Sequence, residues 1–103
     1  MNVDPAVKNN VDSLASQIAD EARLRFGKST QVFWFGSWVN GGASEVSDLD
    51  LAFDLSDSVS VTDFNDFIDW VEQLPTLYKF DLINMTEISE RFKKHILSSG
   101  QLI

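Results

Sequence analysis

The sequence predicts a single domain of the α/β (α+β) class, with a small mixed β-sheet and helices packed mainly on one face. Apolar periodicities alternate along the chain in the order helix, strand, strand, helix, strand, helix. The 103 residues are 44% apolar and 12% aromatic, which is enough for one hydrophobic core but not for a second substrate domain. We therefore expect residues 1–103 to form one domain.

An amphipathic helix is expected at the beginning of the chain. Asp4 can cap it, and Pro5 suits the first helical position. Apolar residues then follow at helical spacing along one side: Val7, Val11, Leu14, Ile18 and Ala22. Gly27 should end this helix.

Two strands are predicted next, over residues 31–35 and 48–53. The first is β-branched and aromatic, and Gly36-Ser37 follows where a buried strand should turn sharply. The second alternates polar with apolar residues, so Asp48 and Asp50 should share one face of the sheet. The opposite face then receives the apolar residues of this strand: Leu49, Leu51 and Phe53.

The remaining elements are a helix, a strand, a helix and a short edge strand. Thr62 is expected to cap the second helix, and Pro75 should end it. Residues 78–83 predict a strand in which Asp81 is buried among apolar neighbours. Thr86 is expected to cap the last helix. Gly100 should stop that helix before a possible edge strand at residues 101–103.

The turn and the aspartates together indicate a phosphate and metal site. Backbone N–H groups and the Ser37 hydroxyl can face phosphate oxygens at the turn. Asp48 and Asp50 lie roughly 7 Å apart at Cα in an extended strand and can converge on one Mg²⁺ ion. A calcium loop starting at Asp48 would need Gly and Glu where the chain has Phe53 and Val59, so it is excluded. A merely solvated strand face remains the alternative.

At these residues the chain resembles the nucleotidyltransferase superfamily related to DNA polymerase β, and most closely its minimal stand-alone bacterial members. Gly36-Ser37, the ten-residue gap and Asp48-Leu49-Asp50 match the signature Gly-Ser-x10-Asp-x-Asp. Asp81 stands where the family has a third carboxylate on a later strand. The resemblance implies the nucleotidyltransferase fold. It also implies transfer of a nucleoside monophosphate, AMP from ATP or the equivalent from another nucleoside triphosphate, to a hydroxyl of a protein or small molecule.

The resemblance also implies the roles of individual residues. Catalytic and metal-binding roles would belong to Asp48, Asp50 and Asp81, with two Mg²⁺ ions in the active complex. Nucleotide-binding roles would belong to Gly36, Ser37, Trp38 and Ser47. For Trp38 two interpretations stay open, because an aromatic residue after a turn can stack on a base or belong to the core.

The chain departs from its relatives in its basic residues. Many members place Arg or Lys just after Gly-Ser, whereas this chain has Trp38 and Asn40. Between Lys28 and Lys79 there is no Lys or Arg, while the same stretch holds nine Asp or Glu residues. A triphosphate would therefore meet a negative surface unless metal ions, Lys79, the last helix or another chain supply cations. A catalytically weak or inactive subunit with this fold is the alternative.

Charge and composition limit the partners. A net charge of −8 and a pI near 4.3 argue against DNA or bulk RNA. The chain has no cysteine, no apolar run that approaches a membrane span and no secretion signal, so a cytoplasmic location is expected. By resemblance, the chain would be the antitoxin-like half of a pair with a helical HEPN-type toxin, acting by modification or by occlusion. An acidic interaction module is a third possibility, and homo-oligomerisation stays open.

Overall fold

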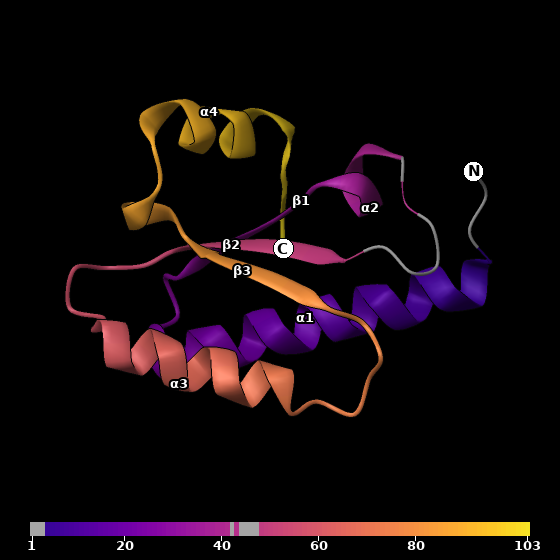
Figure 1. The fold of residues 1–103 in the computed structure, drawn as a ribbon, viewed down its shortest axis with the longest axis horizontal. Helices are drawn as coiled ribbons and strands as arrows, with labels where there is room; N and C mark the ends of the chain where they lie inside the picture. Colours follow the sequence, from indigo (N-terminus) through magenta and orange to yellow (C-terminus); the bar gives the residue numbers. More distant parts are fainter. Residues whose placement is uncertain (1–3, 42, 44–47) are drawn as a thin grey trace.

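A four-stranded mixed sheet forms the centre of the molecule in a computed structural model, which describes residues 4–41, 43 and 48–103 (Figure 1). The strand order is β3-β2-β1-β4. The elements in chain order are α1 (Pro5–Phe26), β1 (Gln31–Phe35), α2 (Ser37–Asn40), β2 (Leu49–Asp54), α3 (Val61–Glu72), β3 (Phe80–Asn84), the 3₁₀ helix η1 (Met85–Glu87), α4 (Glu90–Ser99) and β4 (Gln101–Leu102). The predicted order of helices and strands is confirmed.

Strand pairing is antiparallel around β1 and parallel between β2 and β3. Phe35 pairs with Asp50 across the first of these ladders, and Asp50 pairs with Asp81 across the second. The predicted edge strand is present, because Gln101 and Leu102 pair with β1. The end of β1 and the beginnings of β2 and β3 therefore lie side by side.

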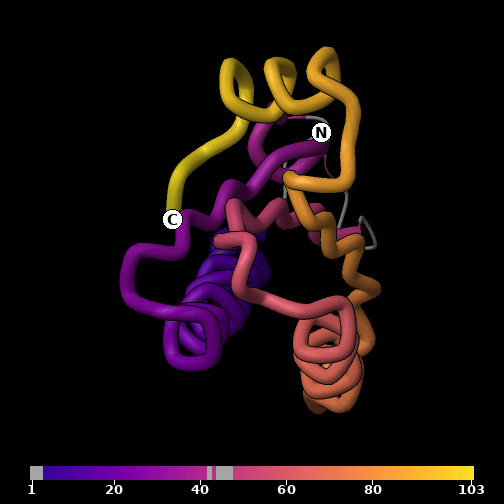
Figure 2. The backbone as a smooth tube through the Cα atoms, turned by 90° about the vertical axis from the view of Figure 1, so that its left-hand side faces the viewer, coloured from indigo at the N-terminus to yellow at the C-terminus, as the bar shows by residue number. Residues whose placement is uncertain are grey.

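The two long helices, α1 and α3, lie against the same face of the sheet, as expected (Figures 1 and 2). The Asp4 side chain accepts a hydrogen bond from the Ala6 backbone N–H at 2.8 Å, and Pro5 is the first helical residue of α1. We call the large cluster between these helices and the sheet the main core. Its fully buried members include Val11, Ile18, Ala22, Val32, Leu49, Leu51, Phe53, Phe67 and Val71.

The opposite face of the sheet is partly covered by α4. Phe33, Phe35 and Ala52 of the sheet pack with Met85 and Ile96, and we call this group the α4-side cluster. The rings of Phe35 and Phe92 meet edge to face, with centroids 5.9 Å apart. The sheet therefore has apolar contacts on both faces, but only the long-helix face is covered along its length (Figure 2).

Two predicted helix caps are wrong. Ser60, not Thr62, caps α3, because its side chain accepts a hydrogen bond from the Asp63 N–H at 3.0 Å. Ser89, not Thr86, caps α4 and accepts from the Phe92 N–H at 3.2 Å. Thr86 instead belongs to η1, where the Asn84 side chain accepts from its backbone N–H. In both cases the serine lies three residues before a first-turn N–H, which is the spacing of a helix cap.

Across the described parts of the chain, no helix combines the length and apolar character that crossing a membrane requires.

Candidate active site

Side-chain alternation along β2 places Asp50 on the face that carries α4. Leu49 and Leu51 belong to the main core, whereas Ala52 belongs to the α4-side cluster. Asp50 therefore faces away from the main core. Asp81 is its register partner on the parallel strand β3, so both side chains leave the sheet on the same side. Asp48 precedes β2 and is exposed.

Asp50 has the perturbed electrostatics of a site residue. Its pKa is raised from 3.8 to about 6, first by burial and then by the negative charges of Asp81 and Asp48. The two neighbouring carboxylates are thus close enough to act on Asp50. A carboxylate whose pKa is raised by burial and by neighbouring charges is typical of functional sites.

The turn after β1 lies directly against the Asp50 carboxylate. Gly36 has φ +83°, and a Cβ built on it would lie 2.0 Å from Asp50 Oδ2. Only glycine combines this positive φ with so close an approach. Ser37 then begins the short helix α2. The structure therefore brings together the two halves of the sequence signature, the Gly-Ser pair and the Asp-x-Asp pair.

Trp38 lies in the main core. Its side chain is only 6% exposed and meets Tyr78 edge to face, with centroids 6.1 Å apart. This arrangement corresponds to the core interpretation of Trp38, and a stacking contact with a base would require the ring to leave this packing. Ser47, the other predicted nucleotide-binding residue of this loop, lies outside the described residues.

Asp81 is exposed, so the expectation that it is buried is wrong. The physical reason is topological, because β3 is the outermost strand of the sheet and has β2 on one side only. Apolar neighbours in the sequence do not bury an edge residue whose side chain points away from the main core. An exposed carboxylate beside Asp50 is accessible to a substrate.

The donor set of Asp48, Asp50 and Asp81 fits a hard cation such as Mg²⁺. All three offer carboxylate oxygens. The pKa of Asp50 is raised first by burial and then by the charges of Asp81 and Asp48, and a bound cation would offset that repulsion. Within residues 4–41, 43 and 48–103, no three acidic, His or Cys side chains already form a cluster with the spacing of a metal site. The carboxylates therefore have the right chemistry, and their side chains would have to close around an ion.

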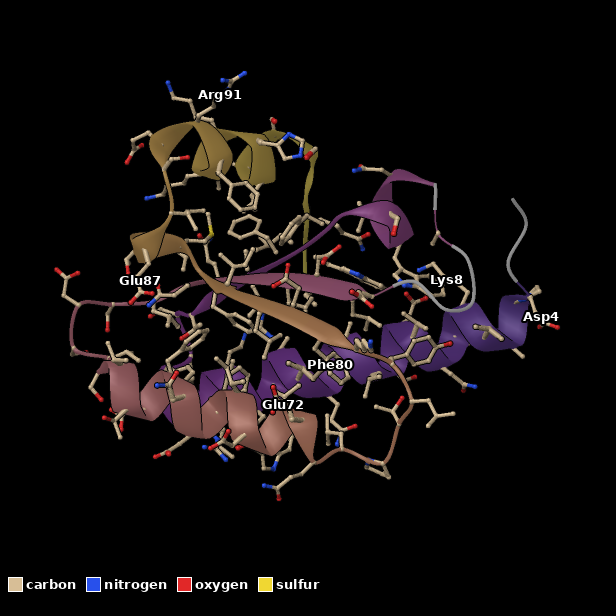
Figure 3. The ribbon with its side chains drawn as sticks, in the orientation of Figure 1. Asp4, Lys8, Glu72, Phe80, Glu87 and Arg91 are labelled. Atoms are coloured by element: carbon tan, nitrogen blue, oxygen red, sulfur yellow. The ribbon has the colours of Figure 1, made fainter. Side chains whose placement is uncertain are left out.

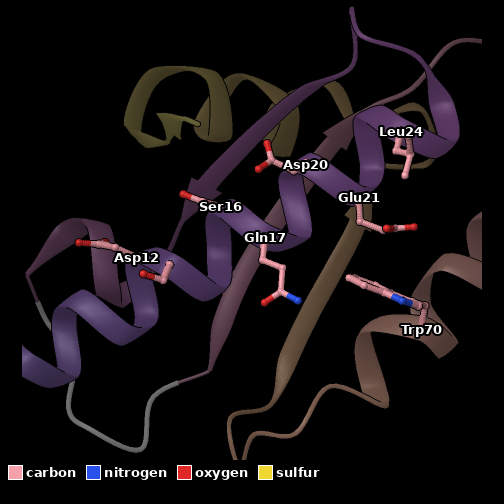
Figure 4. A pocket seen from close by; sticks show the side chains of 8 residues that line it. Asp12, Ser16, Gln17, Asp20, Glu21, Leu24 and Trp70 are labelled. Carbon is pink, nitrogen blue, oxygen red and sulfur yellow. The ribbon is translucent and has the colours of Figure 1, made fainter.

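A groove elsewhere in the molecule does not include these residues. It has a volume of about 730 Å³ and lies between α1 and Trp70 of α3 (Figure 4). Its polar lining consists of Asp12, Ser13, Ser16, Gln17, Asp20 and Glu21. The groove lies on the long helices, and the candidate site lies at the strand ends beside α2.

Comparison with known families identifies the chain. The family model described as Polymerase beta, Nucleotidyltransferase matches residues 9–103, so the chain belongs to this nucleotidyltransferase family. A search of curated protein sequences found no significant match.

Several solved structures have a similar fold. A protein described as a minimal nucleotidyltransferase is 19% identical, with a TM-score of 0.74 over 91% of this chain and 93% of its own. A toxin-antitoxin structure with AMP-PNP is 19% identical, with a TM-score of 0.68 over 85% of this chain and 70% of its own. The toxin-antitoxin MntA-HpeT, with two Asp-to-Glu substitutions two positions apart, is 16% identical, with a TM-score of 0.65 over the same shares. These likenesses show that the chain has the nucleotidyltransferase fold.

Proposed function

We propose that this chain transfers AMP from ATP, or the equivalent group from another nucleoside triphosphate, to a hydroxyl group of a partner protein or small molecule. The observation that carries the proposal is the contact between the Gly36 turn and the Asp50 carboxylate, with Asp81 in register beside it. Membership of the nucleotidyltransferase family supports the reaction class. The fold places the Gly36 turn and the acidic residues at the same end of the sheet, which supports this assignment.

The residues of the chain have separate tasks in this reaction. Gly36 and Ser37 bind the β- and γ-phosphates. Asp48, Asp50 and Asp81 would hold two Mg²⁺ ions, which supply charge stabilisation to the attacking and leaving oxygens. The acceptor oxygen forms a bond to the α-phosphorus, and the bond from that phosphorus to the bridging oxygen of the β-phosphate breaks, so pyrophosphate leaves. Asp81 accepts or orients the acceptor proton.

A protein acceptor is the preferred form of the proposal. Two of the structures with this fold are toxin-antitoxin complexes, and we extend that pairing to this chain as the antitoxin-like half of a HEPN/MNT pair. A net charge of −8 would steer a basic partner toward this chain. A partner Arg could also stabilise the phosphate charge at the site.

A second candidate function is occlusion of a helical partner without transfer. It is favoured by the uncharged residues Trp38 and Asn40 after Gly-Ser, and by the absence of Lys and Arg between Lys28 and Lys79. A subunit with this fold can bind a partner through shape and charge although its catalysis is weak.

The test uses ATP labelled at the α-phosphate, Mg²⁺ and the co-purified product of the adjacent gene. Label should reach the partner with the wild-type chain and stay absent with Asp50→Asn. The matched control is Asp54→Asn, because Asp54 is an exposed carboxylate at the end of the same strand. Mass spectrometry of the partner should show one added AMP. Stable association without label would favour occlusion instead.

A further inference from the structure

Lys79 is hydrogen-bonded to the strand that carries the site aspartates. Its carbonyl oxygen accepts from the Leu49 N–H at 3.0 Å. The parallel register then continues with Leu49 beside Phe80 and Asp50 beside Asp81. One step back along both strands, Lys79 stands beside Asp48. Its backbone therefore borders the candidate site.

The side chain of Lys79 belongs to the same face of the sheet as the site aspartates. Tyr78, Phe80 and Leu82 pack against the main core, and Phe80 lies on the α1 side of β3 (Figure 3). Because successive side chains of an extended segment alternate, Lys79 and Asp81 leave on the opposite side. Two cross-strand pairs thus lie next to each other on one face of the sheet: Lys79 with Asp48, and Asp81 with Asp50.

The other basic residues are on α1, on α4 or in the segment between α1 and β1. Three on α1 form ion pairs with Asp12, Asp20 and Glu21: Lys8, Arg23 and Arg25. Lys28 lies between α1 and β1, and Arg91 is on the outer side of α4 (Figure 3). The remaining two, Lys93 and Lys94, are also on α4. Lys79 is exposed and makes no ion pair with any residue that the structure describes.

We propose that the Lys79 ammonium group binds the phosphate chain of the nucleotide, since Trp38 and Asn40 after Gly-Ser offer no charge. This inference rests on the proposed function. Gly36–Ser37 at the end of β1 and Lys79 at the beginning of β3 stand on either side of β2. A phosphate chain lying across β2 would therefore meet backbone N–H groups on one side and the ammonium on the other. Lysine suits this role because its flexible stem carries a compact charge.

The experiment measures binding of ATP and of adenosine to the purified chain in Mg²⁺ by calorimetry and competition. Lys79→Gln should weaken ATP binding about tenfold, as expected for loss of one charge-assisted contact, and leave adenosine binding unchanged. Lys79→Arg should keep ATP affinity close to wild type. Lys94→Gln is the matched control, because Lys94 is an exposed lysine on α4. The affinity for ATP should also depend less on salt in Lys79→Gln.

Each outcome decides the proposal. Unchanged ATP affinity in Lys79→Gln, with loss of binding in Asp50→Asn, would overturn the role of Lys79 and leave the proposed function intact. Equal weakening of ATP and adenosine would indicate a structural role and also overturn it. Failure of the wild-type chain to bind ATP under any Mg²⁺ concentration would overturn both proposals.

Discussion

The two faces of β2 carry opposite chemistry on alternate residues. Leu49, Leu51 and Phe53 have no exposed surface and form part of the main core. On the other face, Asp50 is half-buried and Asp54 is exposed, with the buried Ala52 between them. One strand therefore contributes both to the main core and, through Asp50, to the candidate site.

The difference shows how a small domain separates two conflicting requirements. Burial of apolar side chains stabilises the fold by about 1.5–3 kcal/mol for each large residue. A half-buried carboxylate beside two others has the opposite effect, as the raised pKa of Asp50 indicates. Because alternation separates the two sets, the site can carry electrostatic strain without a polar group entering the main core.

The largest effect should come from the apolar face. Phe53 is fully buried and meets the rings of Phe64 and Phe67 edge to face at 5.8 and 5.2 Å. Phe53→Ala should lower the free energy of unfolding by about 3–5 kcal/mol, through lost burial and a cavity. Asp54→Asn, on the other face, should change it by less than about 0.5 kcal/mol. Urea unfolding followed by tryptophan emission measures both, and similar losses would contradict the division between the faces.

The next effect tests the contact between the turn and Asp50. Gly36 and Gly41 both have a positive φ, +83° and +84°, but ψ is −158° at Gly36 and 6° at Gly41, and a Cβ at Gly41 would meet nothing within 4 Å. Gly41→Ala should therefore cost only the backbone strain, about 1 kcal/mol. Gly36→Ala should cost about 2–3 kcal/mol, because essentially only glycine adopts φ +83° with ψ −158°, and because the new Cβ also displaces the Asp50 carboxylate.

A double-mutant cycle isolates the steric part of that loss. In the Asp50→Ala background the carboxylate oxygen 2.0 Å from the new Cβ is gone. The cost of Gly36→Ala should then fall to the backbone strain at position 36 alone. An unchanged cost would mean that the carboxylate is not what excludes a side chain at position 36.

The sequence predicted the elements and the strand faces because both depend on local periodicity. The apolar stripe of α1 and the alternation of residues 48–53 repeat at the spacing of a helix and a strand, and packing follows from that spacing. The motif predicts that Gly36 binds phosphate, which stays a prediction. The contact of Gly36 with Asp50 needs the antiparallel pairing of β1 and β2, which no local pattern specifies.

The sequence predictions were wrong where two neighbouring residues could both cap a helix, or where burial depends on the order of the strands. Ser60 and Thr62 are both residue types that cap helices. Ser60 is the cap here because its hydroxyl accepts a hydrogen bond from the Asp63 N–H. The exposure of Asp81 depends on β3 being the edge strand. The burial of Trp38 depends on Tyr78, forty residues away in the chain.

A smaller effect concerns pH and the cost of the site itself. The Asp50 pKa is about 6 in the folded chain and 3.8 as its ordinary value, so the folded state binds this proton more tightly. The contribution of Asp50 to stability should therefore fall as pH rises from about 4 to 6. In metal-free buffer at pH 7, Asp50→Asn should be more stable than wild type by about 1 kcal/mol, after allowance for solvent screening of a half-exposed group. This advantage should disappear near pH 4, and thermal unfolding across the range measures it.

The smallest expected effect tests which neighbour contributes most to the raised pKa of Asp50. Asp81 raises the pKa of Asp50 more than Asp48 does, and burial raises it more than either. Asp81→Asn should therefore lower the Asp50 pKa, Asp48→Asn should lower it less, and the double variant should leave it above 3.8. Titration of the Asp50 side-chain carboxyl by NMR in metal-free buffer measures each midpoint. A larger fall in Asp48→Asn would show that Asp48 lies nearer Asp50 than Asp81 does. A return of the Asp50 pKa to 3.8 in the double variant would show that burial does not contribute to the shift. The site face would then be solvated, and only charge repulsion would distinguish it from the rest of the surface.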